Sequence, residues 1–180
     1  MFKESFNEIL AQEEGGFTLV ELVVVLAIIV VAIGAFLARQ SATSQSSRVM
    51  TEAGNLQTVV GKINSTFAGR TSYAGATTAF LLAQGAFPTS MVSGTNVVNG
   101  WNGNVTVAPG AGSTSVDITY ADVPSSACIE FVANTSKSYR TVTVGSTVVK
   151  TTAQAEADLS ATQAACTAAA TANVIFNAAS

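Results

Sequence analysis

The sequence predicts an α+β protein in which one long N-terminal helix, apolar in its first half and amphipathic in its second, packs on a C-terminal globular head with an antiparallel β-sheet. Residues 17–37 form an apolar run that contains a single charged residue, Glu21. Residues 49–67 carry apolar side chains at helical spacing, and short segments beyond residue 100 alternate with period two between Gly-rich turns. We therefore divide the 180 residues into an N-terminal segment 1–16, a helix 17–68 and a head 69–180.

The apolar run has the length and composition of a membrane span. Fifteen of its 21 residues are Phe, Leu, Ile or Val, and as a helix it would be about 30 Å long, like the hydrocarbon core of a bilayer. Glu21 is its only charged residue. Each large apolar residue favours insertion by roughly 0.3 to 0.6 kcal/mol, and together they outweigh a cost of about 3 kcal/mol for one acid. We expect residues 17–37 to span a membrane.

The second half of the predicted helix has one apolar stripe. Successive apolar positions are separated by four and three residues in alternation, which places them on one face of a helix. These positions are Val49, Ala53, Leu56, Val60, Ile63 and Phe67. Gly69 is expected to end the helix shortly after them.

The head alternates predicted strands with short helices. A short helix is expected at residues 77–84, and residues 99–103, with the sequence NGWNG, predict a turn around a buried indole. Strands are expected at 104–108, 115–120, 139–144, 147–150 and 173–177, and further helices at 124–132 and 155–165. A head of about 110 residues is large enough to bury its own core.

Composition argues against several functional classes. The formal charge is −3, and without residues 1–16 the chain keeps 7 basic and 7 acidic side chains, with the basic residues scattered singly. Nucleic-acid binding, which needs clustered basic residues, is not predicted. Histidine is absent, so we predict no metal site, no cofactor and no catalytic residue. The head carboxylates show no paired arrangement; they are Asp117, Asp122, Glu130, Glu156 and Asp158.

The order of features around Gly16 distinguishes the N-terminus from a secretory signal. Small residues, Gly15 and Gly16, precede the apolar run, and the stretch before them is acidic, whereas a secretory signal has a basic start and small residues after its core. A plain signal anchor, with Glu21 reaching the lipid headgroups, is one alternative. Glycine, Phe17, Glu21 four positions later and the long apolar run together resemble the class III signal of type IV pilins.

This resemblance implies processing and assembly. A prepilin peptidase would remove the leader 1–16 by cutting between Gly16 and Phe17, and the new Phe17 amine would be N-methylated. A charged amine in apolar surroundings needs a partner, and Glu21 is the only acid in the run. We therefore expect Glu21 of one subunit to meet the Phe17 amine of its neighbour and to set the register of assembly. Pairing within one chain, at i and i+4, is the alternative.

The two cysteines fit an exported head. Cys128 and Cys166 are 38 positions apart without a CxxC spacing, so in an exported domain we expect a disulfide rather than a redox pair. The layout resembles type IVb pilins of the PilS thin-pilus kind, whose C-terminal disulfide encloses an exposed segment. That segment corresponds here to the region bounded by residues 128 and 166.

The expected function is that of a structural subunit, not an enzyme. The resemblance implies a major pilin of a type IVb pilus, held in the inner membrane of a Gram-negative-type bacterium and then polymerised into a helical surface filament. Its partners would be copies of itself, prepilin peptidase and the inner-membrane pilus assembly machinery. Attachment, aggregation and conjugative mating contact are the roles implied. The alternative is a pseudopilin of a type II secretion system; a membrane-anchored enzyme is disfavoured.

Overall fold

The computed structural model describes residues 18–179, apart from the side chains of residues 34–43. The chain divides into two compact units, residues 1–42 and 43–180, which we describe separately. Helix α1 (Leu19–Thr66) begins in the first unit and ends in the second. The predicted helix start at Phe17 lies outside the described residues, and the helix ends two residues before the predicted limit at residue 68.

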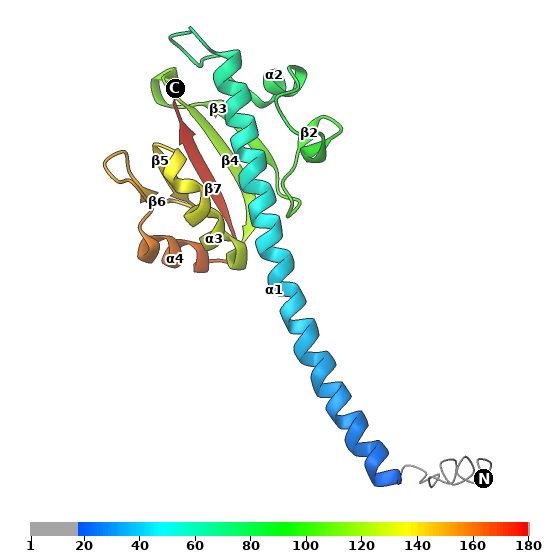
Figure 1. The fold of residues 1–180 in the computed structure, drawn as a ribbon. Helices are drawn as coiled ribbons and strands as arrows, with labels where there is room; N and C mark the ends of the chain where they lie inside the picture. The colour runs from blue at the N-terminus through cyan, green and yellow to red at the C-terminus, as the bar shows by residue number, and fades with distance from the viewer. Residues whose placement is uncertain (1–17, 180) are drawn as a thin grey trace, which may run out of the picture. The chain divides into compact units, whose positions relative to one another are not determined.

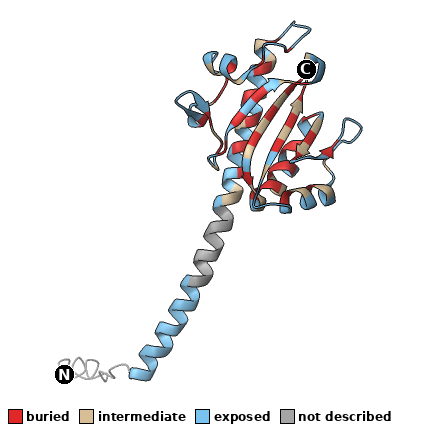
Figure 2. Cartoon of the chain, turned by 180° about the vertical axis from the view of Figure 1, so that it is seen from behind, coloured by how far each residue is buried: buried red, intermediate tan, exposed pale blue. Residues whose placement is uncertain are grey.

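In the first unit, the described side chains belong to the start of α1 and are exposed. Every residue from Leu19 to Ile33 is coloured as exposed in Figure 2. Within the part of the chain that the structure describes, none of the helices combines the length and the apolar character needed to cross a membrane.

The second unit is built on a five-stranded antiparallel sheet. Its spatial order is β3-β4-β7-β5-β6, so that the last strand of the chain lies in the middle (Figure 1). The strands are β3 (Val105–Pro109), β4 (Val116–Pro124), β5 (Thr141–Val144), β6 (Thr147–Lys150) and β7 (Thr171–Ala178). All five were expected. A small hairpin of β1 (Val92–Ser93) and β2 (Asn96–Val97) was not.

Three further α-helices follow α1, one before the first strand and two between strands, and short 3-10 turns occur at Thr89–Met91, Ala111–Ser113 and Ser136–Ser138. The helices are α2 (Thr78–Ala83), α3 (Ser125–Thr135) and α4 (Leu159–Thr167). The prediction started the last helix at residue 155, which is four residues early. Asp158 is its N-cap, and its carboxylate accepts hydrogen bonds from the backbone N–H groups of Ser160 and Ala161 at 2.8 and 3.0 Å.

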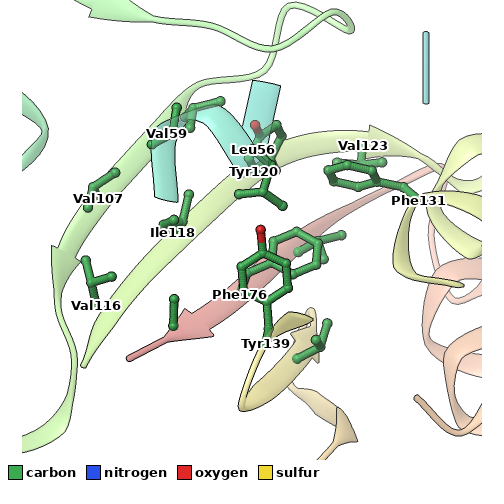
Figure 3. Packing of buried hydrophobic residues seen from close by; sticks show 14 of the residues in the cluster. Leu56, Val59, Val107, Val116, Ile118, Tyr120, Val123, Phe131, Tyr139 and Phe176 are labelled. Atoms are coloured by element: carbon green, nitrogen blue, oxygen red, sulfur yellow. The ribbon is translucent and has the colours of Figure 1, made fainter. Parts of the chain in front are cut away.

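One face of the sheet carries the core. Buried side chains alternate along β4, and the aromatic rings of Tyr120, Phe131 and Phe176 stack between the sheet and α3 with centroids 5.2 to 6.2 Å apart. Figure 3 shows Leu56 and Val59 of α1 facing the same side of the sheet. The opposite side chains of β4 and β7 are half-buried, as in an antiparallel sheet with one covered face.

The second half of α1 packs through the predicted stripe. Val49, Leu56, Ile63 and Phe67 are buried, and the two smaller positions of the stripe, Ala53 and Val60, are half-buried against them. Val59 and Glu52 are also buried on this side, and the prediction did not include them. The helix continues through Gly54 and Gly61 without interruption.

Both edges of the sheet have main-chain groups that are already occupied. At the β3 edge, the Thr78 hydroxyl accepts the N–H of Val107 at 2.7 Å and donates to its carbonyl at 3.2 Å. Pro109, two residues further on the same edge, has no N–H. At the β6 edge, the carbonyl of Val149 accepts the backbone N–H of Asp158 at 2.8 Å. These bonds blunt the edges against pairing with another strand.

The turn at residues 99–103 depends on a glycine. Asn99 accepts the N–H groups of Trp101 and Gly103 through its side-chain oxygen, and its amide donates to the carbonyl of Ala121 at 2.7 Å. A Cβ at Gly103 would lie 1.9 Å from that carbonyl oxygen. Trp101 is half-buried rather than buried as expected, and the centroid of its ring lies 5.6 Å from that of Phe131.

We expect Gly103→Ala to destabilise the protein by about 1 to 3 kcal/mol, because the backbone must move to admit the methyl group. Denaturant unfolding of the full chain in detergent measures this. Gly54→Ala is the matched control: no atom lies within 4 Å of its Cβ position inside α1, so the same change should stabilise by about 0.5 to 1 kcal/mol. Equal effects of the two changes would contradict the steric explanation.

Candidate assembly and processing site

The predicted processing and assembly residues lie at the N-terminal end of α1. Gly16 and Phe17 are outside the described residues, so the proposed cleavage position has no described geometry. Glu21 lies in the first turn of α1 and is exposed. The positive end of the helix dipole is at this terminus, so an acid is favourable here.

Thr18 caps this end of the helix. Its hydroxyl accepts the backbone N–H of Glu21 at 3.3 Å, which places Glu21 at the third helical position after the cap. Thr-x-x-Glu is the sequence of a capping box, in which the acid compensates unpaired backbone N–H groups. Glu21 therefore lies at a position that stabilises the helix start, a local effect that the prediction from the sequence did not consider.

The surface that follows Glu21 is apolar on every side. Every residue from Leu22 to Ile33 is apolar, and the large side chains among them are between 43 and 73% exposed in the single chain, so that no polar face interrupts them. A helix that is hydrophobic all round is normally buried in a membrane or in the core of an assembly. This segment therefore needs surroundings that one molecule does not supply.

The disulfide prediction is confirmed. Cys128 of α3 and Cys166 of α4 are bonded, their Cα atoms are 5.7 Å apart, and both residues are fully buried. The enclosed segment contains exposed positions such as Val148 and Leu159. It also contains β5, whose Val142 and Val144 are buried, so the segment forms part of the core as well as of the surface.

The head carboxylates do not converge on one site. Among residues 18–179, no group of three or more His, Cys, Asp or Glu side chains could hold a metal ion. Each acid has a separate local environment. The carboxylates of Asp117 and Glu130 accept hydrogen bonds from the side chains of Asn177 and Ser46, respectively. Glu156 forms an ion pair with Lys137, Asp158 caps α4, and Asp122 lies at a bulge of β4.

Three buried polar residues were not recognised from the sequence. Glu52, Asn99 and Tyr120 are all at most 4% exposed. Burial raises the pKa of the Glu52 carboxyl, against the smaller lowering effect of hydrogen bonds from Gly100 and Asn55. Burial also raises the pKa of the Tyr120 phenol, and the negative charge of Glu52 adds to this effect. A usable signal existed for Glu52, which lies three residues after Val49 and four before Leu56 on the apolar stripe.

The helix start, its exposed apolar surface and the disulfide-closed head together define a type IV pilin. The prokaryotic N-terminal methylation motif matches residues 13–37. The family described as PilS N terminal matches residues 46–179, which is most of the chain. The protein therefore belongs to the PilS pilin family.

Two solved structures share this fold. A type IVb pilin from Salmonella typhi is 25% identical with a TM-score of 0.58, and the match covers 72% of this chain and 99% of that one. TcpA, a type IV pilin from Vibrio cholerae El Tor biotype, is 18% identical with a TM-score of 0.56, covering 74% of this chain and 99% of that one. No curated protein matches the chain. The α+β pilin fold expected from the sequence is confirmed.

Proposed function

We propose that this protein is the major subunit of a type IVb pilus and polymerises through its N-terminal helix into a surface filament. The observation that carries the proposal is the helix surface from Leu22 to Ile33, which is apolar on all sides and exposed in the single chain. Packing such helices side by side removes this surface from water, at about 25 cal/mol per Å² buried. The heads then form the outside of the filament.

The proposal assigns a function to each part of the chain. Residues 1–16 form the leader, which prepilin peptidase removes. Residues 17–37 span the inner membrane in the precursor and form the filament core after assembly. Residues 69–180 form the head, whose region 128–166 is closed by the disulfide. Attachment, aggregation and conjugative contact are the roles we propose for the filament.

Glu21 provides the specificity of assembly in this proposal. Cleavage leaves a positive amine at Phe17, and N-methylation keeps that charge. Only one axial offset between neighbouring helices brings Glu21 of one subunit to the Phe17 amine of the next. The pair would therefore fix the register, as a buried polar residue does in coiled coils. Copies of the chain, the peptidase and the inner-membrane assembly machinery are the partners.

A pseudopilin of a type II secretion system shares the N-terminal motif and is the alternative. The match of residues 46–179 to the PilS family supports the pilin assignment, because it covers the second half of α1 and the head rather than the shared motif.

Intact-mass and N-terminal analysis of sheared surface filaments tests the proposal. We expect chains that begin at N-methylated Phe17, and the matched variant Gly16→Val should retain the leader and give no filaments. Processed protein that stays in the cell envelope, without surface filaments at native expression, would favour the pseudopilin. Exported filaments whose subunits still carry Met1 would exclude the processing scheme.

A further inference from the structure

Glu52 is a buried carboxylate in the second half of α1. It is 4% exposed, and its Oε1 atom accepts the side-chain N–H of Asn55 at 3.2 Å. The backbone of Gly100 lies against the same carboxylate, since a Cβ at Gly100 would be 3.1 Å from Oε1. Its Oε2 atom is buried with no hydrogen-bond partner among the described residues. A buried carboxylate oxygen without a donor is costly when it carries charge.

A second unpaired polar atom lies within electrostatic reach of Glu52. Tyr120 of β4 is fully buried, and its hydroxyl has no hydrogen-bond partner in the described part of the chain. The charge of Glu52 acts on the Tyr120 phenol, which raises its pKa beyond the effect of burial. If Glu52 is ionised, its charge therefore lies near the buried Tyr120 ring, and its Oε2 atom has no hydrogen-bond donor among the described residues.

The loop of residues 99–103, which we term the Trp101 loop, covers this carboxylate. Three side chains from one face of α1 hold it. Gln45 accepts the indole N–H of Trp101 at 3.4 Å, and Arg48 donates to the carbonyl of Gly100 at 3.5 Å. Glu52 lies against the same Gly100, where a Cβ would be 3.1 Å from its Oε1.

The charged groups around Glu52 do not compensate it. No ion pair within 4.0 Å is formed by Glu52 in the described residues. Arg48 of the same helix is engaged with Gly100, and Tyr120 is neutral at ordinary pH because burial raises its pKa. Tyr139, beside the sheet, is buried with a raised pKa, and Glu130 of α3 is engaged with Ser46. Loss of solvation is thus the largest effect on Glu52.

We propose that Glu52 is a proton-operated latch between α1 and the Trp101 loop. With the proton bound, the carboxyl is neutral and the loop closes over it. When pH rises and the proton leaves, the carboxylate needs water, and the loop opens to admit it. The hydrogen bond from Gly100 favours the charged form, but its effect is smaller than that of lost solvation, so ionisation favours opening.

The direction of the pH effect follows from the raised pKa. Below the ordinary value of 4.5, Glu52 is protonated in folded and unfolded protein alike. Between 4.5 and the higher pKa of the folded state, only the folded protein keeps the proton. The free energy of unfolding contributed by this group therefore falls as pH rises through that window, and its penalty is complete above it.

Trp101 reports the latch directly, because it is the only tryptophan of the chain and lies in the loop itself. The experiment titrates the full chain in detergent micelles from pH 4 to 9 and records tryptophan emission and its quenching by acrylamide. We expect a single step with a midpoint above 4.5, with emission moving to longer wavelength and quenching increasing as pH rises.

Two variants assign the step. Glu52→Gln should lose it and keep the acid-form spectrum throughout, whereas Glu130→Gln, a matched acid that also contacts α1 through Ser46, should keep it. A step that persists in Glu52→Gln would overturn the proposal. So would a wild-type midpoint at or below 4.5, or the absence of any step, and these two outcomes do not depend on the folding of a variant.

Discussion

Replacing Glu21 by Ala is expected to leave the protein inserted and processed but to reduce filament yield more than tenfold. Without the acid, the Phe17 amine of the neighbouring subunit would be buried without a partner. Removing one partner of a buried charge pair typically costs about 3 to 5 kcal/mol, and 1.4 kcal/mol already corresponds to a factor of ten. Quantifying sheared filaments against the processed membrane pool measures the effect.

Two further variants separate assembly from helix capping. Glu21→Gln keeps the size of the side chain but not its charge, so it should fail like Glu21→Ala. Thr18→Ala removes the hydroxyl that accepts the Glu21 N–H, which costs about 1 kcal/mol at the helix start, and should still give filaments. Normal filament yield from Glu21→Gln would show that Glu21 does not set the register. Loss of filaments in Thr18→Ala alone would show that the cap is what matters.

Removal of the disulfide should have the second large effect. Cys128 and Cys166 close a loop of 38 positions, and in the chain-entropy model such a cross-link contributes about 4 kcal/mol to the free energy of unfolding. The double variant Cys128→Ala, Cys166→Ala should therefore unfold at clearly lower denaturant concentration. Since the bond joins α3 to α4, we expect α4 and β6 to lose hydrogen-exchange protection before β4 and β7.

Reduction of the wild-type protein is the matched control, because it removes the cross-link without leaving the small cavities of two alanines. The reduced protein should lose slightly less stability than the double variant. A stability loss under 1 kcal/mol in both samples would contradict the prediction.

The local elements of the head could be predicted because their turns carry clear residue signals. The segment PGAG at 109–112 and the pair Gly145-Ser146 separate period-two runs, and β3 to β6 form there as expected. The bulge that lengthens β4 could not be predicted. It places Asp122 at φ 54°, and its N–H meets the side chain of Asn173, which lies 51 positions away.

The strand order was beyond the reach of local patterns. The final strand, β7, lies between β4 and β5, and this position follows from long-range packing of Phe176 against Tyr120 and Phe131. The start of α4 was misplaced because alanine-rich residues before Asp158 have helix-forming composition, although Asp158, directly before Leu159, is an available N-cap signal.

The candidate sites differ in how far a sequence can reveal them. Glu21 is the only charged residue in an apolar run, so its unusual position can be recognised from the sequence alone. Glu52 lies between Thr51 and Ala53, and its position on the apolar stripe indicates that it faces the core but not what covers it. Its environment is created by a loop some fifty residues later in the chain, and no local pattern carries that information.

The occupied sheet edges have a consequence for a protein that would be packed at very high density. A subunit that polymerises through one surface must avoid association through others. An exposed edge strand with unpaired N–H and C=O groups is the part of a β-sheet that pairs most readily with another chain. At the β3 edge, Val107 is hydrogen-bonded to Thr78 and Pro109 has no N–H; at the β6 edge, Val149 is hydrogen-bonded to Asp158. Strands of neighbouring heads therefore cannot pair with the sheet at these points. In the proposed filament, crowded heads would thus stay separate folded domains, and ordered growth would depend on the helices.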